Sequence, residues 1–182
     1  MSRALIVVDV QPTFCEGGAL PVDGGNACAE RIARFVAERG GEYALVATTQ
    51  DWHIDPGKHF SSAPDVAGTP EAELHPALAD LHADIRVKKG QYCAAYSGFE
   101  GVAEDGASLE EALRAAGITE VDVVGLAQSH CVCETALDAK RAGFEVRVLS
   151  DLTEPVSVET GATASKRLSE AGIAEVASAP LS

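Results

Sequence analysis

Basic residues and long apolar runs are both scarce in this sequence. Its 182 residues include 14 lysines and arginines against 28 aspartates and glutamates, which gives a formal net charge of −14 at pH 7. Because nucleic acids and anionic membrane surfaces are bound mainly through basic side chains, the sequence predicts neither partner. No stretch approaches the roughly 18 uninterrupted apolar residues of a membrane helix, and the first residues lack the layout of a signal peptide. We therefore expect a cytoplasmic protein.

The cysteines do not predict a disulfide framework. There are five of them, and an odd number in a chain of this length is typical of reduced thiols. Hydrophobic residues make up 46% of the chain, which is enough to form a buried core. Because we find no internal repeat and no linker, we expect residues 1–182 to form a single domain.

Short runs rich in valine, isoleucine and leucine alternate with longer amphipathic segments. This alternation is typical of βα units on a mostly parallel sheet. We predict an α/β protein with three α/β/α layers around a six-stranded, mostly parallel, doubly wound sheet. The expected strands are Ala4–Asp9, Tyr43–Thr48, Asp84–Val87, Val121–Gly125, Glu145–Leu149 and Ile173–Val176. The expected helices are Gly25–Arg39, Ser108–Ala116, Cys131–Ala142 and Val158–Ala171.

Residues with reactive side chains follow four of the predicted strands. Asp9 ends the first strand, Asp51 and His53 follow the second, Lys89 follows the third, and Cys131 follows the fourth after a short turn. In a doubly wound sheet, ligands bind where the carboxyl ends of the strands meet. We therefore expect an acid, two possible metal ligands, a cation and a thiol to converge at one edge of the sheet.

Cys131 is the candidate nucleophile because it begins a predicted helix, where the helix dipole lowers the pKa of a thiol. A small buried cysteine is the alternative, and we interpret Cys133 as such a packing residue. A half-buried Asp9 needs a cation nearby, and Lys89 suits this role better than Lys88, since consecutive strand residues point in opposite directions. An acid–base and nucleophile site and a purely structural ion pair both fit this pattern.

Asp51, His53 and His59 form the candidate metal site. A carboxylate and two imidazoles suit one divalent ion such as Zn, Fe or Mn. The alternative is that the histidines are solvated loop residues. His75 and His82 lie in the following segment and are interpreted as structural.

Four blocks of the sequence contain most of these residues and occur in a fixed order. They are "ALIVVDVQPTFCEGGAL", "TQDWHIDPGKHFS", "KKGQYCAAYSGFEG" and "EVDVVGLAQSHCVCETALDAKRAGFEVRVLSDLT". Together they resemble the nicotinamidase/pyrazinamidase enzymes of the isochorismatase-like cysteine hydrolase superfamily, and the resemblance covers essentially the whole chain. It implies a catalytic triad of Asp9, Lys89 and Cys131.

The same resemblance implies further site residues. The peptide between Leu126 and Ala127 is expected to be cis, and the N–H groups of Ala127 and Cys131 are expected to form an oxyanion hole. Metal ligation is implied for Asp51, His53 and His59. Substrate binding is implied for Phe14, Tyr96 and His130.

Two departures from the family pattern concern the site. The segment "HFSSAPDVAGTPEAELHP" lacks a Trp-Pro-Pro-His-Cys stretch, which in the family supplies a further metal-binding histidine and a tryptophan that stacks on the substrate ring. The remaining metal ligands would be Asp51, His53 and His59. In addition, Ser129 stands two residues before the expected nucleophile, where the family usually has aspartate, which puts the local hydrogen bonds of this loop in doubt.

The resemblance implies an amidohydrolase that acts in NAD salvage. It would convert nicotinamide, and pyrazinamide-like amides, to the acid and ammonia through a cysteine thioester. One alternative is a related hydrolase that acts on another small amide or a vinyl ether. Another is a binding protein whose catalysis weakened when the metal loop was truncated. The expected partner is a small amide substrate, and the protein is expected to be a monomer or a homo-oligomer.

Overall fold

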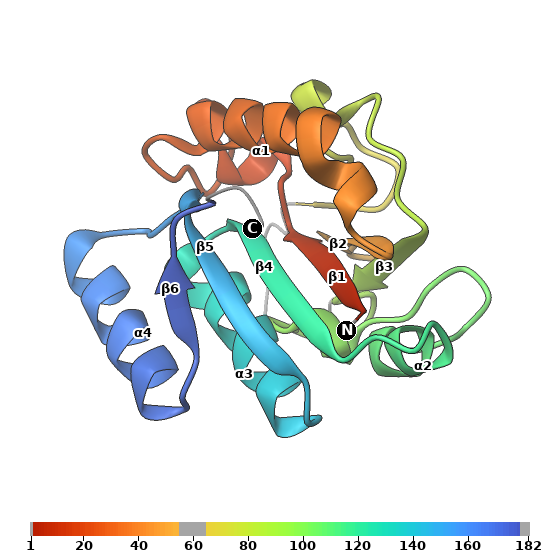
Figure 1. Ribbon diagram of the computed structural model, residues 1–182. Helices are drawn as coiled ribbons and strands as arrows, with labels where there is room; N and C mark the ends of the chain where they lie inside the picture. The colour runs from red at the N-terminus through yellow and green to blue at the C-terminus, as the bar shows by residue number, and fades with distance from the viewer. Residues whose placement is uncertain (1, 55–64, 179–182) are drawn as a thin grey trace.

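A parallel β-sheet forms the centre of the molecule. The computed structural model describes residues 2–54 and 65–178, and within them six strands pair in the order β3-β2-β1-β4-β5-β6 (Figure 1). Every neighbouring pair is parallel, so the sheet is fully rather than mostly parallel. The strands are β1 (Arg3–Val8), β2 (Leu45–Asp51), β3 (Ile85–Lys89), β4 (Glu120–Leu126), β5 (Glu145–Glu154) and β6 (Ala174–Val176).

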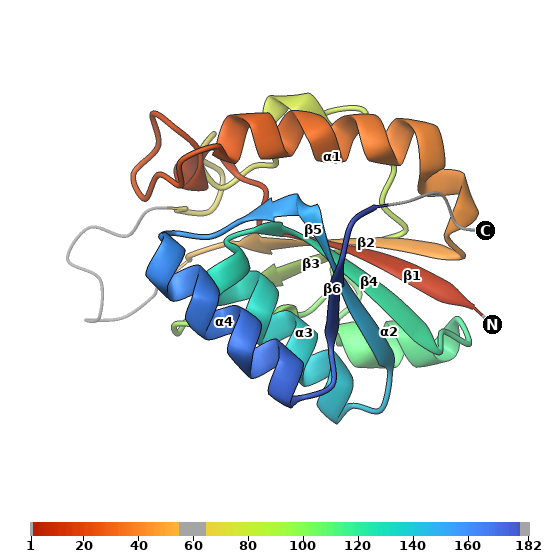
Figure 2. The ribbon, with the colours of Figure 1, turned by 60° about the vertical axis from the view of Figure 1, so that its left-hand side comes forward.

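Helices cover both faces of the sheet, as predicted for a three-layer fold. Figure 2 shows α1 on one face and α2, α3 and α4 on the other. The helices are α1 (Gly25–Arg39), α2 (Leu109–Ala115), α3 (Cys133–Arg141) and α4 (Val158–Glu170). Among the described residues, none of these helices combines the length and apolar character that a bilayer crossing needs.

The central strand β1 is buried on both sides. Its alternate residues Ala4, Ile6 and Val8 pack in the apolar cluster that includes α2, α3 and α4. Leu5 and Val7 point the other way and pack with the apolar residues of α1. Burying side chains of this size stabilises the fold by roughly 1.5–3 kcal/mol each. This two-sided packing explains why the strand is a continuous apolar run in the sequence.

Four strands, β2, β3, β4 and β5, extend further toward their carboxyl ends than the sequence predicts, and β1 ends at Val8, one residue earlier than predicted. The strand expected at Tyr43–Thr48 begins at Leu45 and continues to Asp51. The backbone of Asp51 is held there by the Gln11 side chain, which accepts from its N–H at 2.9 Å and donates to its carbonyl at 3.0 Å. Strand β5 continues past Leu149 because an irregularity in its pairing with β4 lets the ladder resume at Thr153.

The helix expected to begin at Cys131 begins two residues later. Residues Gln128–Val132 form a π-helical turn, η6, and α3 starts at Cys133. The carbonyl of Ala127 accepts the N–H groups of both His130 and Val132, at 3.1 and 3.2 Å, which widens this turn. The expected nucleophile therefore lies in the turn and not in the first turn of α3.

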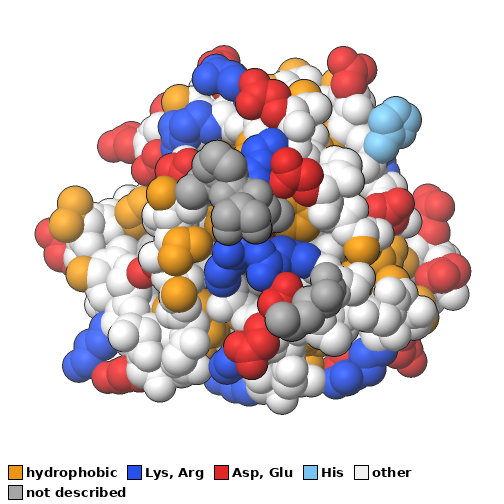
Figure 3. Space-filling view, in the orientation of Figure 1, with side chains coloured by type: hydrophobic (Ala, Val, Ile, Leu, Met, Phe, Trp, Pro, Cys, Tyr) orange, Lys and Arg blue, Asp and Glu red, His pale blue; other side chains and the backbone are white. Residues whose placement is uncertain are grey.

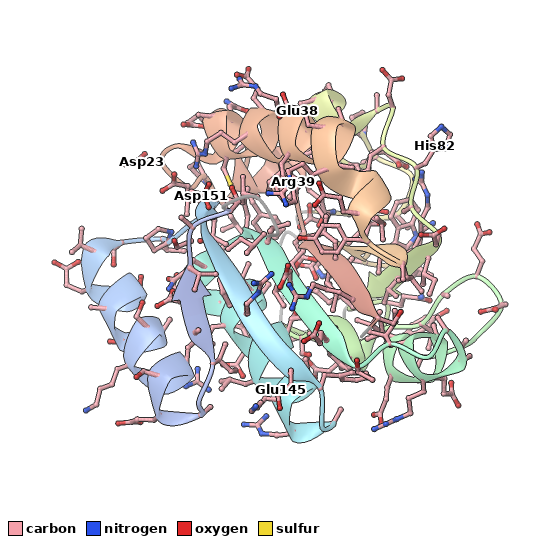
Figure 4. All side chains as sticks on the ribbon, viewed as in Figure 1. Asp23, Glu38, Arg39, His82, Glu145 and Asp151 are labelled. Atoms are coloured by element: carbon pink, nitrogen blue, oxygen red, sulfur yellow. The ribbon has the colours of Figure 1, made fainter. Side chains whose placement is uncertain are left out.

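His75 has side-chain hydrogen-bond partners, whereas His82 is exposed. His75 precedes the short helix η4 (Pro76–Leu78), its Nδ1 accepts the N–H of Ala77 at 3.1 Å, and its Nε2 lies 2.9 Å from Oδ1 of Asn26. His82 is exposed and extends away from the body of the molecule (Figure 4). Neither histidine lines the cavity beside Cys131.

Acidic side chains lie among the basic ones on the face drawn in Figure 3. Several arginines pair with acids of the protein itself. Arg147 Nη2 lies 2.7 Å from Oδ2 of Asp122, and Arg3 Nη2 lies 2.9 Å from Oε2 of Glu120. These arginines are thus paired with acidic side chains of the protein itself.

Candidate active site

Asp9, Lys89 and Cys131 meet at the carboxyl edge of the sheet. Asp9 follows β1 directly, Lys89 is the last residue of β3, and Cys131 lies in the turn after β4. The Nζ atom of Lys89 is 2.8 Å from Oδ2 of Asp9 and 3.8 Å from Sγ of Cys131. All three side chains are buried. An acid, an ammonium and a thiol from distant parts of the chain therefore share one site.

Thr49 is a further member of this cluster that sequence reasoning missed. Its Oγ1 donates a hydrogen bond to Oδ1 of Asp9 at 2.6 Å, and its carbonyl accepts the N–H of Asp9 at 3.1 Å. Asp9 adopts a positive φ of 46°, a conformation that non-glycine residues seldom adopt. The threonine and the ammonium of Lys89 together fix the orientation of the carboxylate. The alternation along β2 could have indicated Thr49, since it sits two residues before Asp51.

Lys89 also holds Asp51. Its Nζ atom forms an ion pair with Oδ1 of Asp51 and donates to the carbonyl of Ala95 at 3.0 Å. Burial alone would lower the pKa of Lys89, but the negative charges of Asp9, Cys131 and Asp51 outweigh this effect and raise it. Burial and the charge of Asp9 raise the pKa of Asp51, although Lys89 opposes them. Two carboxylates thus share a single permanently charged ammonium.

The thiol of Cys131 is protonated at rest. Burial, followed by the negative charge of Asp9, raises its pKa well above the usual thiol value, and the charge of Lys89 only partly opposes this. The low thiol pKa expected from a helix start is not found, because Cys131 is 7% exposed and precedes α3. A reaction at Sγ therefore requires a base, and the carboxylate of Asp9 is adjacent.

The backbone before Cys131 has the expected cis peptide. It joins Leu126 to Ala127, at the junction of β4 and the turn η6. Gly125, just upstream, has a φ of 121°, and a Cβ added there would lie 2.1 Å from the carbonyl oxygen of Val8. Only glycine allows β4 to approach β1 this closely. This approach lies directly before the turn that carries Cys131, whose thiol interacts with Asp9.

A cavity of about 480 Å³ opens beside Cys131. It is lined by all three residues that the resemblance implied for substrate binding, together with the thiol and acidic groups. The lining includes Phe14, Tyr96, His130, Cys131, Asp51 and Asp65. The ring centroids of Tyr96 and His130 are 6.2 Å apart. A cavity of about 580 Å³ lies elsewhere, between α1 and η4, and shares none of these lining residues.

Ser129 forms specific hydrogen bonds in place of the family's aspartate. Its Oγ accepts the N–H of Val156 at 3.0 Å and lies 2.9 Å from Nδ1 of His130. The serine therefore links the turn η6 to the chain segment between β5 and α4. The hydrogen bonds of this loop are therefore formed with serine at position 129.

Asp65 is the second site residue that sequence reasoning missed. It is 1% exposed, has a positive φ of 61°, lines the cavity and interacts with the side chain of Thr13. Burial and the charges of Asp51 and Asp9 raise its pKa to about 8. No local pattern in the sequence indicates it, because its environment comes from residues distant in the chain.

The proposed metal ligands are only partly described. Asp51 and His53 line the cavity, and His59 lies outside the described residues. Within residues 2–54 and 65–178, no three histidine, cysteine, aspartate or glutamate side chains form a group able to hold a metal ion. A carboxylate and two imidazoles are donors that suit a divalent ion, so ligation by Asp51, His53 and His59 stays a prediction.

Comparisons with known proteins place the chain in a family. A model of the isochorismatase domain matches residues 3–180. The nicotinamidase/pyrazinamidase of Mycobacterium tuberculosis is 49% identical over an alignment of 185 residues. The alignment covers 97% of this chain and 99% of the relative. The nicotinamidase of Escherichia coli is 32% identical, over 86% of this chain and 85% of the relative.

Solved structures agree with this assignment. A pyrazinamidase of Pyrococcus horikoshii in complex with zinc has a TM-score of 0.85 and 34% identity, covering 97% of this chain and 99% of that one. A protein from L. infantum in complex with nicotinate has a TM-score of 0.84 and 31% identity, covering 97% of this chain and 93% of that one. By domain match, sequence identity and fold, the chain belongs to the isochorismatase family.

Proposed function

We propose that this protein hydrolyses the carboxamide of nicotinamide, and of pyrazinamide-like amides, to the acid and ammonia. The observation that carries the proposal is the placement of the Cys131 thiol against Asp9 and Lys89 at the wall of a cavity. The names of the similar proteins, nicotinamidase and pyrazinamidase, support the choice of substrate.

The first half of the reaction forms a thioester. Asp9 accepts the proton of the Cys131 thiol, Sγ forms a bond to the carboxamide carbon, and the carbonyl electron pair moves to oxygen. The N–H groups of Ala127 and Cys131 stabilise this oxyanion, and a donor of this kind is worth on the order of 3 kcal/mol in the transition state. When the C–N bond breaks, the nitrogen takes the proton from Asp9 and leaves as ammonia.

The second half hydrolyses the thioester. Asp9 accepts a proton from water as the oxygen attacks the acyl carbon, and the C–S bond breaks to release the acid. The sulfur then regains a proton from Asp9, which restores the starting state. Lys89 stabilises the anions at Asp9 and Cys131 through its charge and keeps the Asp9 carboxylate oriented.

The walls of the cavity position the ring of the substrate. Phe14 and Tyr96 line the cavity and supply apolar faces. Asp51, His53 and His59 would hold one divalent ion, Zn, Fe or Mn. The chemistry that such an ion supplies when bound is a coordination position for the ring nitrogen. Positioning of this kind accelerates attack by fixing the amide carbon near Sγ.

His130 presents an N–H donor to the substrate in this proposal. The Oγ atom of Ser129 accepts the Val156 N–H and lies 2.9 Å from Nδ1 of His130. In this proposal the Ser129 hydroxyl donates its hydrogen to Nδ1, and the imidazole proton then resides on Nε2. An aspartate at position 129 would accept from Nδ1–H and leave Nε2 as an acceptor. Serine therefore favours a substrate with an acceptor atom facing His130.

Replacing Ser129 by alanine is expected to raise KM for nicotinamide about fivefold with little change in kcat, since one hydrogen bond of about 1 kcal/mol is lost. The 15N NMR resonances of His130 should show a mixture of tautomers in this variant and a single tautomer in the wild type. Ser129→Thr keeps the hydroxyl and should retain both wild-type properties. Wild-type KM and resonances in Ser129→Ala would contradict the assignment.

The function itself is tested by a panel of substrates. The purified protein should release ammonia from nicotinamide and pyrazinamide, and it should leave isochorismate and ureido amides largely unchanged. Turnover of a different amide or of the vinyl ether, without ammonia from nicotinamide, would make the protein another hydrolase of the family. Binding of nicotinamide without turnover, together with slow alkylation of Cys131, would indicate a binding protein.

We also propose a cytoplasmic location and a role in NAD salvage. All five cysteines are free, which supports a reducing compartment. The proposed product, nicotinic acid, is a precursor for pyridine nucleotide synthesis. Detection of the protein in a cytoplasmic fraction, and accumulation of nicotinamide when its gene is disrupted, would test these assignments.

A further inference from the structure

Three exposed apolar side chains lie where the cavity beside Cys131 meets solvent. Leu20, Tyr96 and Val156 all line this cavity, yet they are 54%, 56% and 51% exposed. They come from three segments, which precede α1, follow β3 and join β5 to α4. Figure 2 shows the first and the last of these segments at the same end of the sheet. We call these three side chains the apolar rim.

Backbone hydrogen bonds fix two parts of the apolar rim. The N–H of Leu20 donates to the carbonyl of Thr13 at 2.9 Å, and the N–H of Val156 donates to Oγ of Ser129 at 3.0 Å. The exposure of these two side chains is therefore set by the fold. Apolar groups held exposed beside a cavity are typical of ligand-binding grooves, because a bound apolar group removes them from water.

The buried acid of the site decides which part of a substrate faces the apolar rim. Asp9 is fully buried and does not line the cavity, although its side chain interacts with the Cys131 thiol. In the proposed reaction Asp9 gives a proton to the leaving nitrogen, so this nitrogen must lie on the buried side of Cys131. The ring of the substrate is then on the open side of the cavity, toward the rim.

The cavity also has more room than one substituted ring needs. Its volume of about 480 Å³ lies in the range of roughly 300–1,000 Å³ that holds ligands of drug size. Nicotinamide, by contrast, is a single ring with one carboxamide. The remaining volume lies on the ring side, since the buried ion pair of Asp9 and Lys89 closes the nitrogen side.

We propose that the apolar rim is a subsite for an apolar substituent on the substrate ring. This subsite makes primary aromatic amides with an alkyl group on the ring better substrates than nicotinamide. The bonds that form and break are those of the proposed reaction, and the products are ammonia and the substituted acid. The inference deepens the proposed function and rests on it.

The test compares two amides that differ only by the substituent. Nicotinamide and 5-butylnicotinamide are suitable, because position 5 is adjacent neither to the ring nitrogen nor to the carbon that carries the carboxamide. Ammonia release by the full-length, metal-supplemented protein gives kcat/KM for each amide. We expect a ratio of about 10 in favour of 5-butylnicotinamide, since one fully buried methylene is worth about fourfold and the rim leaves the butyl group partly exposed.

Serine variants of the rim test its apolar character. Leu20→Ser and Val156→Ser should each lower this ratio by about threefold or more, because less apolar surface is buried against the butyl group. Val158→Ser is the matched control, since Val158 is 82% exposed and close to Val156 in the chain but does not line the cavity. Its ratio should equal that of the wild type. The ratio cancels any loss of activity that affects both amides alike.

A third amide tests the direction of the substrate. N-Butylnicotinamide carries the same group on nitrogen, where it meets Asp9 and Lys89, so release of nicotinic acid from it should be much slower than ammonia release from 5-butylnicotinamide. Faster hydrolysis of the N-butyl amide would overturn the proposal. A wild-type ratio of one or less would also overturn it. If the serine variants dissociate a dimer and keep the wild-type ratio, the rim is an interface with a second copy of the chain and the proposal is wrong.

The outcomes also distinguish this proposal from the proposed function. Nicotinamide hydrolysis with a ratio of one or less would support the proposed function and overturn the subsite. If neither amide is hydrolysed, the proposed function fails, and calorimetric binding of 5-butylnicotinic acid still tests the rim. Tighter binding of this acid than of nicotinic acid, weakened in Leu20→Ser and not in Val158→Ser, would then support the subsite, and equal binding of the two acids would overturn it.

Discussion

Replacing Cys131 by alanine is expected to lower the rate of ammonia release from nicotinamide by about 10⁴-fold or more, because the variant has no nucleophile for the thioester step. The side chain packs beside Asp9 and Lys89, and removing its sulfur leaves the ion pair between them intact. The fold should therefore remain. Ammonia release under saturating nicotinamide, with a urea unfolding curve of the same sample, measures both effects.

Cys133→Ala is the matched control for this variant. Cys133 is also buried, but it lies at the first residue of α3, and its Sγ faces Arg167 at 3.9 Å. Its replacement should cost some stability through lost packing and leave kcat close to the wild-type value. Substantial turnover by Cys131→Ala would remove the thiol from the mechanism, even if Cys133→Ala behaved as expected.

Replacing Lys89 by methionine is expected to abolish activity and to lower the free energy of unfolding by about 3–5 kcal/mol, as breaking a buried ion pair does. The variant leaves Asp9 and Asp51 buried without the ammonium that neutralises them. Methionine fills a similar volume, so the loss reflects charge rather than a cavity. Urea unfolding at pH 7 and ammonia release measure the two effects.

The pH dependence of Lys89→Met gives a second measurement. Lys89 lowers the pKa of Asp51, which burial and Asp9 nevertheless raise to about 6, so its removal should raise this pKa further. The side-chain carboxyl group of aspartate in an unfolded chain has a pKa of about 3.9. At pH values between the unfolded pKa and the raised folded pKa, Asp51 is protonated in the folded state and ionised in the unfolded state. The free energy of unfolding of the variant should therefore fall as the pH rises through this range, more steeply than that of the wild type. A pH-independent difference would contradict this explanation.

Lys88→Met is the control for the neighbouring position. The Nζ atom of Lys88 lies 3.7 Å from the centroid of the Trp52 ring and is not in the Asp9 cluster. Its loss should cost about 1 kcal/mol or less, the usual size of a partly exposed cation–π contact. An equal loss of stability in Lys88→Met and Lys89→Met would show that the buried ion pairs are not the cause.

The sequence predicted those parts of the site that follow from the positions of the strands. Asp9 and Lys89 end buried apolar runs, and parallel strands bring their carboxyl ends to one edge whatever their distance along the chain. The preference for Lys89 over Lys88 follows from strand alternation, and the structure places Lys89 inside and Lys88 against Trp52. The resemblance added the cis peptide before Ala127, which no periodicity reveals.

Other features depend on contacts that the sequence does not encode locally. The spacing of Asp51 and His53 indicated metal ligands, but it could not reveal that Asp51 also pairs with Lys89, since that depends on the register of β2 and β3. The π-helical turn moved the start of α3 by two residues, because the Ala127 carbonyl accepts two N–H groups. Asp65 was missed because its burial arises from distant segments.

The single ammonium shared by Asp9 and Asp51 constrains how this protein can diverge. A descendant that kept the fold but abandoned hydrolysis could lose its thiol in one substitution at little cost. It could not lose Lys89 alone, because Asp9 and Asp51 would then be buried without a cation and the folded state would be destabilised. Replacing the whole cluster would need several simultaneous substitutions. We therefore expect inactive homologues that have lost the cysteine to retain the lysine and both aspartates.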